Sequence, residues 1–201
     1  MDETNTHILS LSKARAKLLF DANVLSYAQQ AYNATGIHLL DYMDRISGTV
    51  DWWVSSRVAV DLYNNGILPG VLRNMLNCDY PDMKMNDFPY EKEDGSLGFV
   101  KLNTVSGDDW SQICLAYNYP ELIIVTNDAK MLKSAHAVLR GRALPFHEFL
   151  KQVSPYWFYD KNWLQLKTWF VDNVMPLRNN SSWILPGEAA RQKPLPKSET
   201  R

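Results

Sequence analysis

The sequence predicts an α/β fold in which helices flank a central, mostly parallel sheet, with an aromatic helical extension at the carboxyl end. Three observations lead to this prediction. Short apolar runs of strand length alternate with helical patterns along most of the chain. Two of the runs, 18–20 and 122–126, are apolar almost throughout, which is typical of buried parallel strands. Each run leads to an aspartate at the start of a helical pattern, namely Asp21 and Asp128.

The composition is that of an ordinary soluble, globular chain. Its 201 residues fit one α/β domain with an appendage, and 46% of them are hydrophobic and 21% charged. Two cysteines, Cys78 and Cys114, form neither a disulfide framework nor a metal-binding spacing, so a reducing cytoplasm is expected. The first residues lack a signal-peptide pattern, and no apolar run approaches the roughly 18 residues that a membrane span needs. These features predict a cytoplasmic protein without a membrane segment.

The first strand is the stretch around which the chain is expected to be organised. An N-terminal arm, residues 1–16, precedes the strand, which ends at Asp21. From Ala22 onward the apolar spacing is helical until Gly36 breaks it. A strand that delivers a carboxylate to the edge of a sheet and turns at once into a helix favours a binding or catalytic site. The alternative is that Asp21 merely caps the helix, because Asp is a favoured N-cap residue. This stretch alone supports the two interpretations equally.

The other elements of the predicted domain, residues 17–150, follow from the same two periodicities. In the first half of the chain the sequence predicts a helix from 37 to about 48, a strand at 50–54, a helix from 55–56 to 64–66, and a helix at 68–76. In the second half it predicts a strand at 99–102, a helix from 106, a strand at 122–126, a helix from 128, a strand at 137–144 and a helix at 146–150. Residues 77–98 are polar, acidic and turn-rich, so they are predicted to be an insertion or a mobile loop.

Four aspartates in four separate segments are the candidates for chemistry: Asp21, Asp61, Asp109 and Asp128. In a parallel sheet the ends of strands and the starts of the following helices meet at one edge, so these carboxylates are expected to gather there. Crowded carboxylates repel one another unless cations neutralise them. Hard divalent ions with oxygen ligands, Mg²⁺ or Mn²⁺, are the natural partners of such a cluster. Taken singly, an aspartate at a helix start is more often a cap.

The order of these motifs resembles the PIN-domain family of metal-dependent nucleases. The most specific parts are Asp-Ala-Asn-Val-Leu at 21–25 and Val-Thr-Asn-Asp at 125–128. Between them lie Ser-x-x-x-x-Asp-Leu at 56–62 and Asp-Trp-Ser-Gln-Ile-Cys-Leu-Ala at 109–116. The resemblance covers about residues 17–150. It departs from the family pattern at Asp61, where the family usually has Glu, and a side chain shorter by one methylene reaches about 1.5 Å less, enough to matter in a metal site.

The resemblance implies a role for each matching residue. Asp21, Asp109 and Asp128 would be catalytic metal ligands, with Asp61 as the fourth, and Asn23 and Thr126 would orient them. Asp108 is an alternative to Asp109, although its spacing to Ala116 is one residue worse.

The function implied is that of a Mg²⁺- or Mn²⁺-dependent endoribonuclease that hydrolyses RNA with metal-bound water and leaves a 5′-phosphate. The resemblance is compatible with either a toxin paired with an antitoxin or a processing nuclease. An alternative of a different class is a catalytically impaired PIN-like domain that serves as a binding or assembly module, and Asp61 is the feature that separates the two.

A block of basic residues follows the fourth acid and is the candidate contact for the RNA backbone. Its members are Lys130, Lys133, Arg140 and Arg142. The helix that starts at Asp128 is expected to direct these charges toward the site. The alternative interpretation is a solvated helix face.

The composition changes after residue 150. The extension, residues 151–201, carries a dense run of aromatic residues and then a basic, proline-containing tail, predicted to be disordered from Pro186. Asp160 is expected to cap a helix whose apolar stripe runs through Trp163, Leu166, Phe170 and Val174. We expect this helix to dock on the nuclease-like core. The alternatives are an interface with a partner or a second copy, and base stacking, which the segment's lack of interleaved positive charge disfavours.

Overall fold

The computed structural model describes residues 16–46, 50–64, 76–78, 89–91, 94, 96–99 and 106–174. The side chains of Ala16, Asp61 and the strand residues 76–78, 89–91 and 97–99 lie outside that description. The N-terminal arm up to residue 15 and the basic tail from Pro186 also fall outside the described residues.

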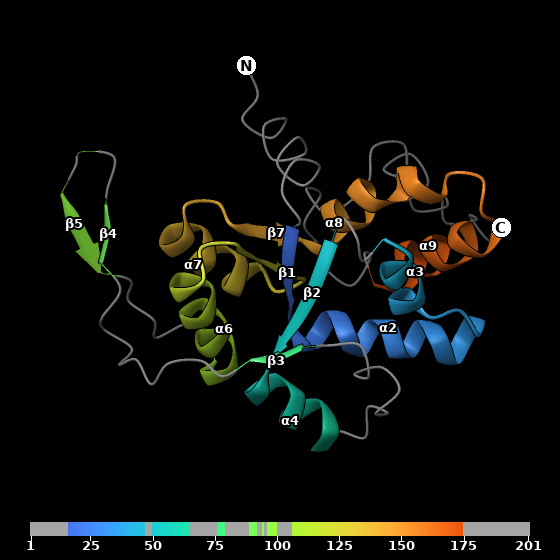
Figure 1. Ribbon diagram of the computed structural model, residues 1–201, viewed down its shortest axis with the longest axis horizontal. Helices are drawn as coiled ribbons and strands as arrows, with labels where there is room; N and C mark the ends of the chain where they lie inside the picture. Colours follow the sequence, from blue (N-terminus) through green and yellow to red (C-terminus); the bar gives the residue numbers. More distant parts are fainter. Residues whose placement is uncertain are drawn as a thin grey trace, which may run out of the picture.

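A five-stranded sheet forms the centre of the molecule, and all of its strand pairs are parallel (Figure 1). Its order is β3 (Leu76–Cys78), β2 (Val50–Ser55), β1 (Ala16–Phe20), β6 (Leu122–Thr126) and β7 (Ala143–Pro145). The first strand of the chain is thus the central one. Because the strands are parallel, their carboxyl ends share one edge, and Asp21 and Asp128 both follow strands that end there. This arrangement confirms the predicted α/β fold class.

Helices cover both faces of the sheet. The larger apolar cluster holds residues of α2 (Ala22–Thr35), α3 (Leu39–Arg45), α4 (Ser56–Asn64), α8 (Phe146–Val153) and α9 (Lys161–Asn173). The second cluster lies between the sheet and the helices α6 (Gly107–Asn118) and α7 (Ala129–Leu139). The central strand serves both, because Leu18 and Phe20 join the first cluster and Leu19 joins the second. A strand that is buried on both faces has a continuous run of apolar residues, and this run is what predicted the strand from the sequence.

The end of α2 and the start of α4 lie where the sequence predicts them, whereas α8 continues to Val153, three residues beyond its predicted end. α2 stops at Gly36, whose φ of 72° is left-handed and favours glycine. The backbone N–H of Gly36 donates to the carbonyl of Tyr32 at 2.8 Å. At the start of α4, the Ser55 hydroxyl caps the helix by accepting from the backbone N–H of Val58 at 3.2 Å.

The predicted strand at 137–144 is wrong in extent. The helix α7 continues to Leu139, and the chain turns at Arg140 and Gly141, with φ values of 50° and 83°, before β7 begins at Ala143. Along α7 the buried apolar residues recur with helical spacing, namely Met131, Ala135, Val138 and Leu139, whereas Ala137 is exposed. The helical spacing of these residues, rather than the number of apolar residues, indicates a helix instead of a strand.

The stretch 77–98, expected to be an insertion, contributes to the sheet at its start. Leu76–Cys78 pairs in parallel with β2 as the edge strand β3. Further along, β4 (Pro89–Glu91) and β5 (Leu97–Phe99) form a separate antiparallel pair. The strand expected at 99–102 overlaps β5 only at Phe99, and the helix expected at 68–76 lies outside the described residues apart from Leu76.

The aromatic helix α9 docks on the core, as the sequence led us to expect. Its stripe is buried within the larger cluster: Trp163, Leu166, Phe170 and Val174. The Asp160 carboxylate caps the helix, accepting from the backbone N–H groups of Asn162 and Trp163 at 2.9 and 3.1 Å. Its Oδ1 also accepts from the hydroxyl of Tyr42 on α3 at 2.9 Å.

A short 3₁₀ turn, Ser154–Trp157, leads from α8 into α9. The Trp157 ring lies 4.8 Å from that of Trp163 and 5.1 Å from that of Tyr42, so the turn, α3 and α9 meet in one aromatic cluster. Within the described ranges, none of the helices combines the length and apolar composition needed to cross a membrane.

Candidate active site

Asp21 lies at the carboxyl end of the central strand and is 4% exposed. It occupies the N-cap position of α2, but its side chain makes no capping hydrogen bond. Instead Oδ1 accepts from Nε2 of Gln112 at 3.0 Å, and Oδ2 accepts from the hydroxyl of Thr126 at 2.7 Å. The capping interpretation of Asp21 is therefore wrong for the side chain. A buried aspartate held by donors from two other elements is unusual for a residue that is mostly exposed in proteins.

Burial raises the pKa of Asp21 to about 6. Water is the better solvent for a carboxylate, so removing it disfavours the ionised form. The hydrogen bonds from Thr126 and Gln112 act in the opposite direction, and the negative charge of Asp109 raises the pKa further. Asp21 is thus an acid whose charge the fold itself does not fully compensate.

Thr126 connects Asp21 to Asp128. Its hydroxyl donates to Asp21 and accepts from the backbone N–H of Asp128 at 2.9 Å. The Asp128 carboxylate caps α7, because its Oδ1 accepts from the backbone N–H groups of Lys130 and Met131. Asn23 acts on the same turn, with its Oδ1 accepting from the backbone N–H of Asn127 at 3.2 Å. Both predicted orienting residues thus contact the turn from β6 into α7: Thr126 is the last residue of β6, and Asn23 reaches the turn from the start of α2.

Asp109 lies in the first turn of α6 and belongs to a capping box. Its Oδ2 accepts from the backbone N–H of Ser106, and its own N–H donates to the Ser106 hydroxyl, both at 3.1 Å. Burial raises the pKa of Asp109, and the charges of Asp128 and Asp108 raise it further. Asp109 is therefore the acid that interacts with both Asp21 and Asp128.

The neighbouring Asp108 is engaged differently. Its carboxylate pairs with the guanidinium of Arg57 on α4. This pair connects α4 to α6. Asp109 interacts with Asp21 and Asp128, whereas Asp108 pairs with Arg57, and the choice of Asp109 as the ligand stays a prediction.

The fourth candidate, Asp61, lies in α4, but its side chain is outside the described part of the chain. Among the side chains that the structure does describe, no group of three or more His, Cys, Asp and Glu is arranged to hold a metal ion. The chemistry of the donors nevertheless suits a hard divalent cation. Asp21, Asp109 and Asp128 supply only oxygen, and their mutual repulsion contributes to the raised pKa values of Asp21 and Asp109.

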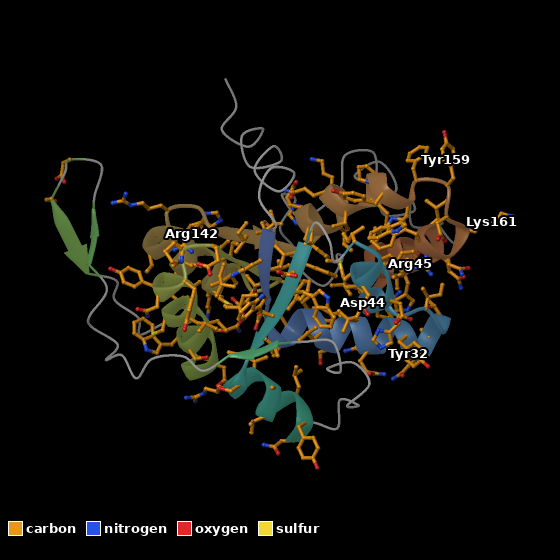
Figure 2. All side chains as sticks on the ribbon, viewed as in Figure 1. Tyr32, Asp44, Arg45, Arg142, Tyr159 and Lys161 are labelled. Carbon is orange, nitrogen blue, oxygen red and sulfur yellow. The ribbon has the colours of Figure 1, made fainter. Side chains whose placement is uncertain are left out.

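The residues of the basic block lie at both ends of the parallel strands, some at the carboxyl ends and some at the amino ends. Lys130 and Lys133 are exposed on the first turns of α7, beside Asp128. Arg142 lies at the opposite edge, where its Nη1 donates to the carbonyls of Ala116 at 2.8 Å and Leu122 at 2.9 Å (Figure 2).

The expectation that the whole block faces the site is therefore wrong for Arg140 and Arg142. The 11-residue helix α7 carries the chain about 16 Å back along the sheet, at 1.5 Å per residue, before either arginine is reached. Arg142 fastens the end of α6 to the start of β6.

Gln112 is a site residue that the sequence reasoning missed. It is fully buried on α6, one turn after Asp109, in a row of otherwise mostly apolar buried residues. The available signal was a polar amide in the middle of an apolar helix face that follows a candidate acid. That signal alone does not say what the amide contacts, because the contact to Asp21 spans 91 residues of sequence.

No protein-family model and no curated protein sequence matches this chain. Among solved structures, the chain is similar to a PilT N-terminus domain protein from the hyperthermophilic archaeon Sulfolobus solfataricus, with 10% sequence identity and a TM-score of 0.45. The similarity covers 68% of this chain and 92% of the archaeal one.

Proposed function

We propose that this protein is a Mg²⁺- or Mn²⁺-dependent endoribonuclease whose acidic site lies at the carboxyl edge of the sheet. The observation that carries the proposal is that three acids from separate segments are close enough to interact: the charge of Asp109 acts on Asp21, and that of Asp128 acts on Asp109. The burial of Asp21 adds to it, because an aspartate without a structural cation is normally left in water. The resemblance of the motifs to PIN-domain nucleases supplies the reaction class.

In this proposal, Asp21, Asp109 and Asp128 would hold the ion, with Asp61 as the fourth ligand that the family resemblance implies. An ion held there would lower the pKa of a bound water and would neutralise charge on the leaving oxygen of the phosphodiester. Thr126 holds the Asp21 carboxylate and the start of α7 in one arrangement. Asn23 fixes the turn that carries Asp128.

The direct test is cleavage of an end-labelled single-stranded RNA with Mg²⁺ or Mn²⁺ titrated against a chelator. Asp128→Asn is the informative variant, because Asn is as good an N-cap as Asp and keeps the acceptor for the Lys130 and Met131 N–H groups. We expect this variant to melt within a few degrees of the wild type and to lose cleavage. Normal cleavage by Asp128→Asn would limit Asp128 to capping α7, and metal-independent cleavage would contradict the proposed mechanism.

Lys130 and Lys133 are the residues that we expect to bind RNA phosphates near the site. Both are exposed on the first turns of the helix that Asp128 caps. Replacing both by Gln should weaken RNA binding and reduce the slope of log affinity against log salt by roughly 0.7 for each phosphate of the single strand that is no longer neutralised. The matched control is Lys151→Gln together with Lys167→Gln, two lysines on α8 and α9. An unchanged slope in the Lys130/Lys133 variant would assign these lysines to solvation alone.

A second function, a PIN-like binding or assembly module, is favoured by two specific observations. The carboxylates of Asp109 and Asp128 both serve as helix caps, and the described side chains do not form a metal-holding group. The departure from the family's Glu at position 61 points the same way. The cleavage assay separates the two functions: a protein that binds RNA or a protein partner but cleaves nothing at any Mg²⁺ or Mn²⁺ concentration would be the module.

A further inference from the structure

Gln112 is buried in α6, where the nitrogen of its amide contacts Asp21 and the oxygen has no hydrogen-bond partner among the described residues. Nε2 donates to Asp21 Oδ1 at 3.0 Å, and the side chain has no exposed surface. Oε1 is buried and accepts no hydrogen bond from the part of the chain that the structure describes. We infer that Gln112 is a positioning residue that sets the orientation of the Asp21 carboxylate, an inference that rests on the proposed nuclease function.

The geometry around Asp21 supports this role. The carboxylate of an aspartate rotates about the Cβ–Cγ bond, and a hydrogen bond to only one of its oxygens restricts this rotation less than a hydrogen bond to each. Here each oxygen has its own donor: Gln112 on α6 contacts Oδ1, and Thr126 on β6 contacts Oδ2. The two donors come from the elements that carry Asp109 and lead to Asp128. They therefore fix the plane of Asp21 relative to both of the other acids.

The buried Oε1 of Gln112, which has no partner among the described residues, argues that this residue is not there to stabilise the fold. A buried amide oxygen without a donor destabilises a folded protein, and an apolar side chain of similar shape avoids that penalty. Most of the buried residues near Gln112 on α6 are apolar, including Trp110, Ile113 and Leu115, although Ser111 is polar. Methionine would suit the same space, since it has a similar length and flexibility. The hydrogen bond to Asp21 is the feature of Gln112 that such a replacement removes.

The test compares Gln112→Met with a matched control, Gln29→Met. Gln29 is also a buried glutamine whose Nε2 donates to a side-chain oxygen, that of Asn33 at 2.9 Å, and whose Oε1 lacks a partner among the described residues. It lies on α2 and its hydrogen bond joins two residues of that helix, so it does not involve Asp21. For each variant, kcat and KM for a single-stranded RNA are measured with Mg²⁺, Mn²⁺ affinity is measured by calorimetry, and unfolding is followed in urea.

We expect Gln112→Met to unfold at a urea concentration close to that of the wild type and to lose about 10- to 100-fold in kcat or in Mn²⁺ affinity, with KM changed less than about twofold. Gln29→Met should keep the wild-type kcat. If Gln112→Met does not fold, Gln112→Glu carries the test, because it has the same size but replaces the donor by a group that repels Asp21.

Three results would overturn the inference, and they are distinguishable. Equal kcat and equal Mn²⁺ affinity in a folded Gln112→Met protein would refute the role of Gln112 while leaving the nuclease proposal intact. The same losses in Gln29→Met would show a general effect of removing buried amides. A wild-type protein that neither cleaves RNA nor binds Mn²⁺ would refute the proposed function, and the inference that rests on it, before any variant is compared.

Discussion

Asp21→Asn is expected to abolish RNA cleavage and, at neutral pH without metal, to make the protein more stable than the wild type. The carboxylate is buried, and its pKa of about 6 means that folding opposes its ionisation. A difference of about two pKa units corresponds to roughly 3 kcal/mol of unfolding free energy. Asn cannot accept both hydrogen bonds that reach Asp21, so about 1 kcal/mol of that gain is lost again. The expected net gain is about 1–2 kcal/mol.

The direction of the pH dependence follows from the raised pKa. The stabilising contribution of neutral Asp21 is fully present below the unfolded value of 3.8 and is lost as the pH rises through about 6. Wild-type stability should therefore fall relative to Asp21→Asn between about pH 4 and pH 7. Urea unfolding of both proteins in chelator across that range measures the difference. Asp172→Asn, an exposed change on α9, is the control and should follow the wild type.

Two outcomes would contradict this account of Asp21. An Asp21→Asn protein that is less stable than the wild type at pH 7 in chelator would make the carboxylate structural. Full cleavage activity in the same variant would remove Asp21 from the site. Loss of activity together with a gain in stability is the combination that a purely structural residue does not produce.

Trp163→Ala and Phe170→Ala are expected to destabilise the protein by about 3–5 kcal/mol each. Both residues belong to the larger apolar cluster, where Trp163 is 1% exposed and Phe170 is 0% exposed. Phe170 lies 5.0 Å from Phe146 in an edge-to-face contact, and the Trp163 indole N–H donates to the Ser154 hydroxyl at 3.3 Å. Removing either ring leaves a cavity that the surrounding strands and helices fill only in part. Urea unfolding of the full chain measures the loss.

Leu164→Ala is the matched control on the same helix, because that side chain is 47% exposed. We expect it to change stability by less than about 0.5–1 kcal/mol. If the Trp163 and Phe170 variants instead keep wild-type stability and shift an equilibrium between oligomers, α9 is an interface that separates from the core in solution. Loss of stability without a change in molecular mass supports docking.

The two strands 18–20 and 122–126 could be predicted because burial on both faces gives a strand a continuous apolar run. Because each of these strands is followed by an aspartate, and because parallel strands have their carboxyl ends on the same side of the sheet, the sequence also predicted that Asp21 and Asp128 lie on that side. The edge strand β3 could not be found, because three residues that pair on one side with β2 leave too short a pattern. The end of α7 was misplaced for a related reason: an apolar stretch fits a strand or a helix until its period is counted.

The sequence by itself determined that the site is built from aspartates and that Asp21 and Asp128 lie at the carboxyl ends of parallel strands. The tertiary structure decided how each acid is held. Spacing along the chain cannot show that Gln112 and Thr126, 91 and 105 residues from Asp21, donate to its two oxygens. Nor can it show that Arg142 binds the end of α6 instead of facing the acids. Such hydrogen bonds depend on the packing of α6 and β6 against β1, because they act over about 3 Å in space, whatever the separation in sequence.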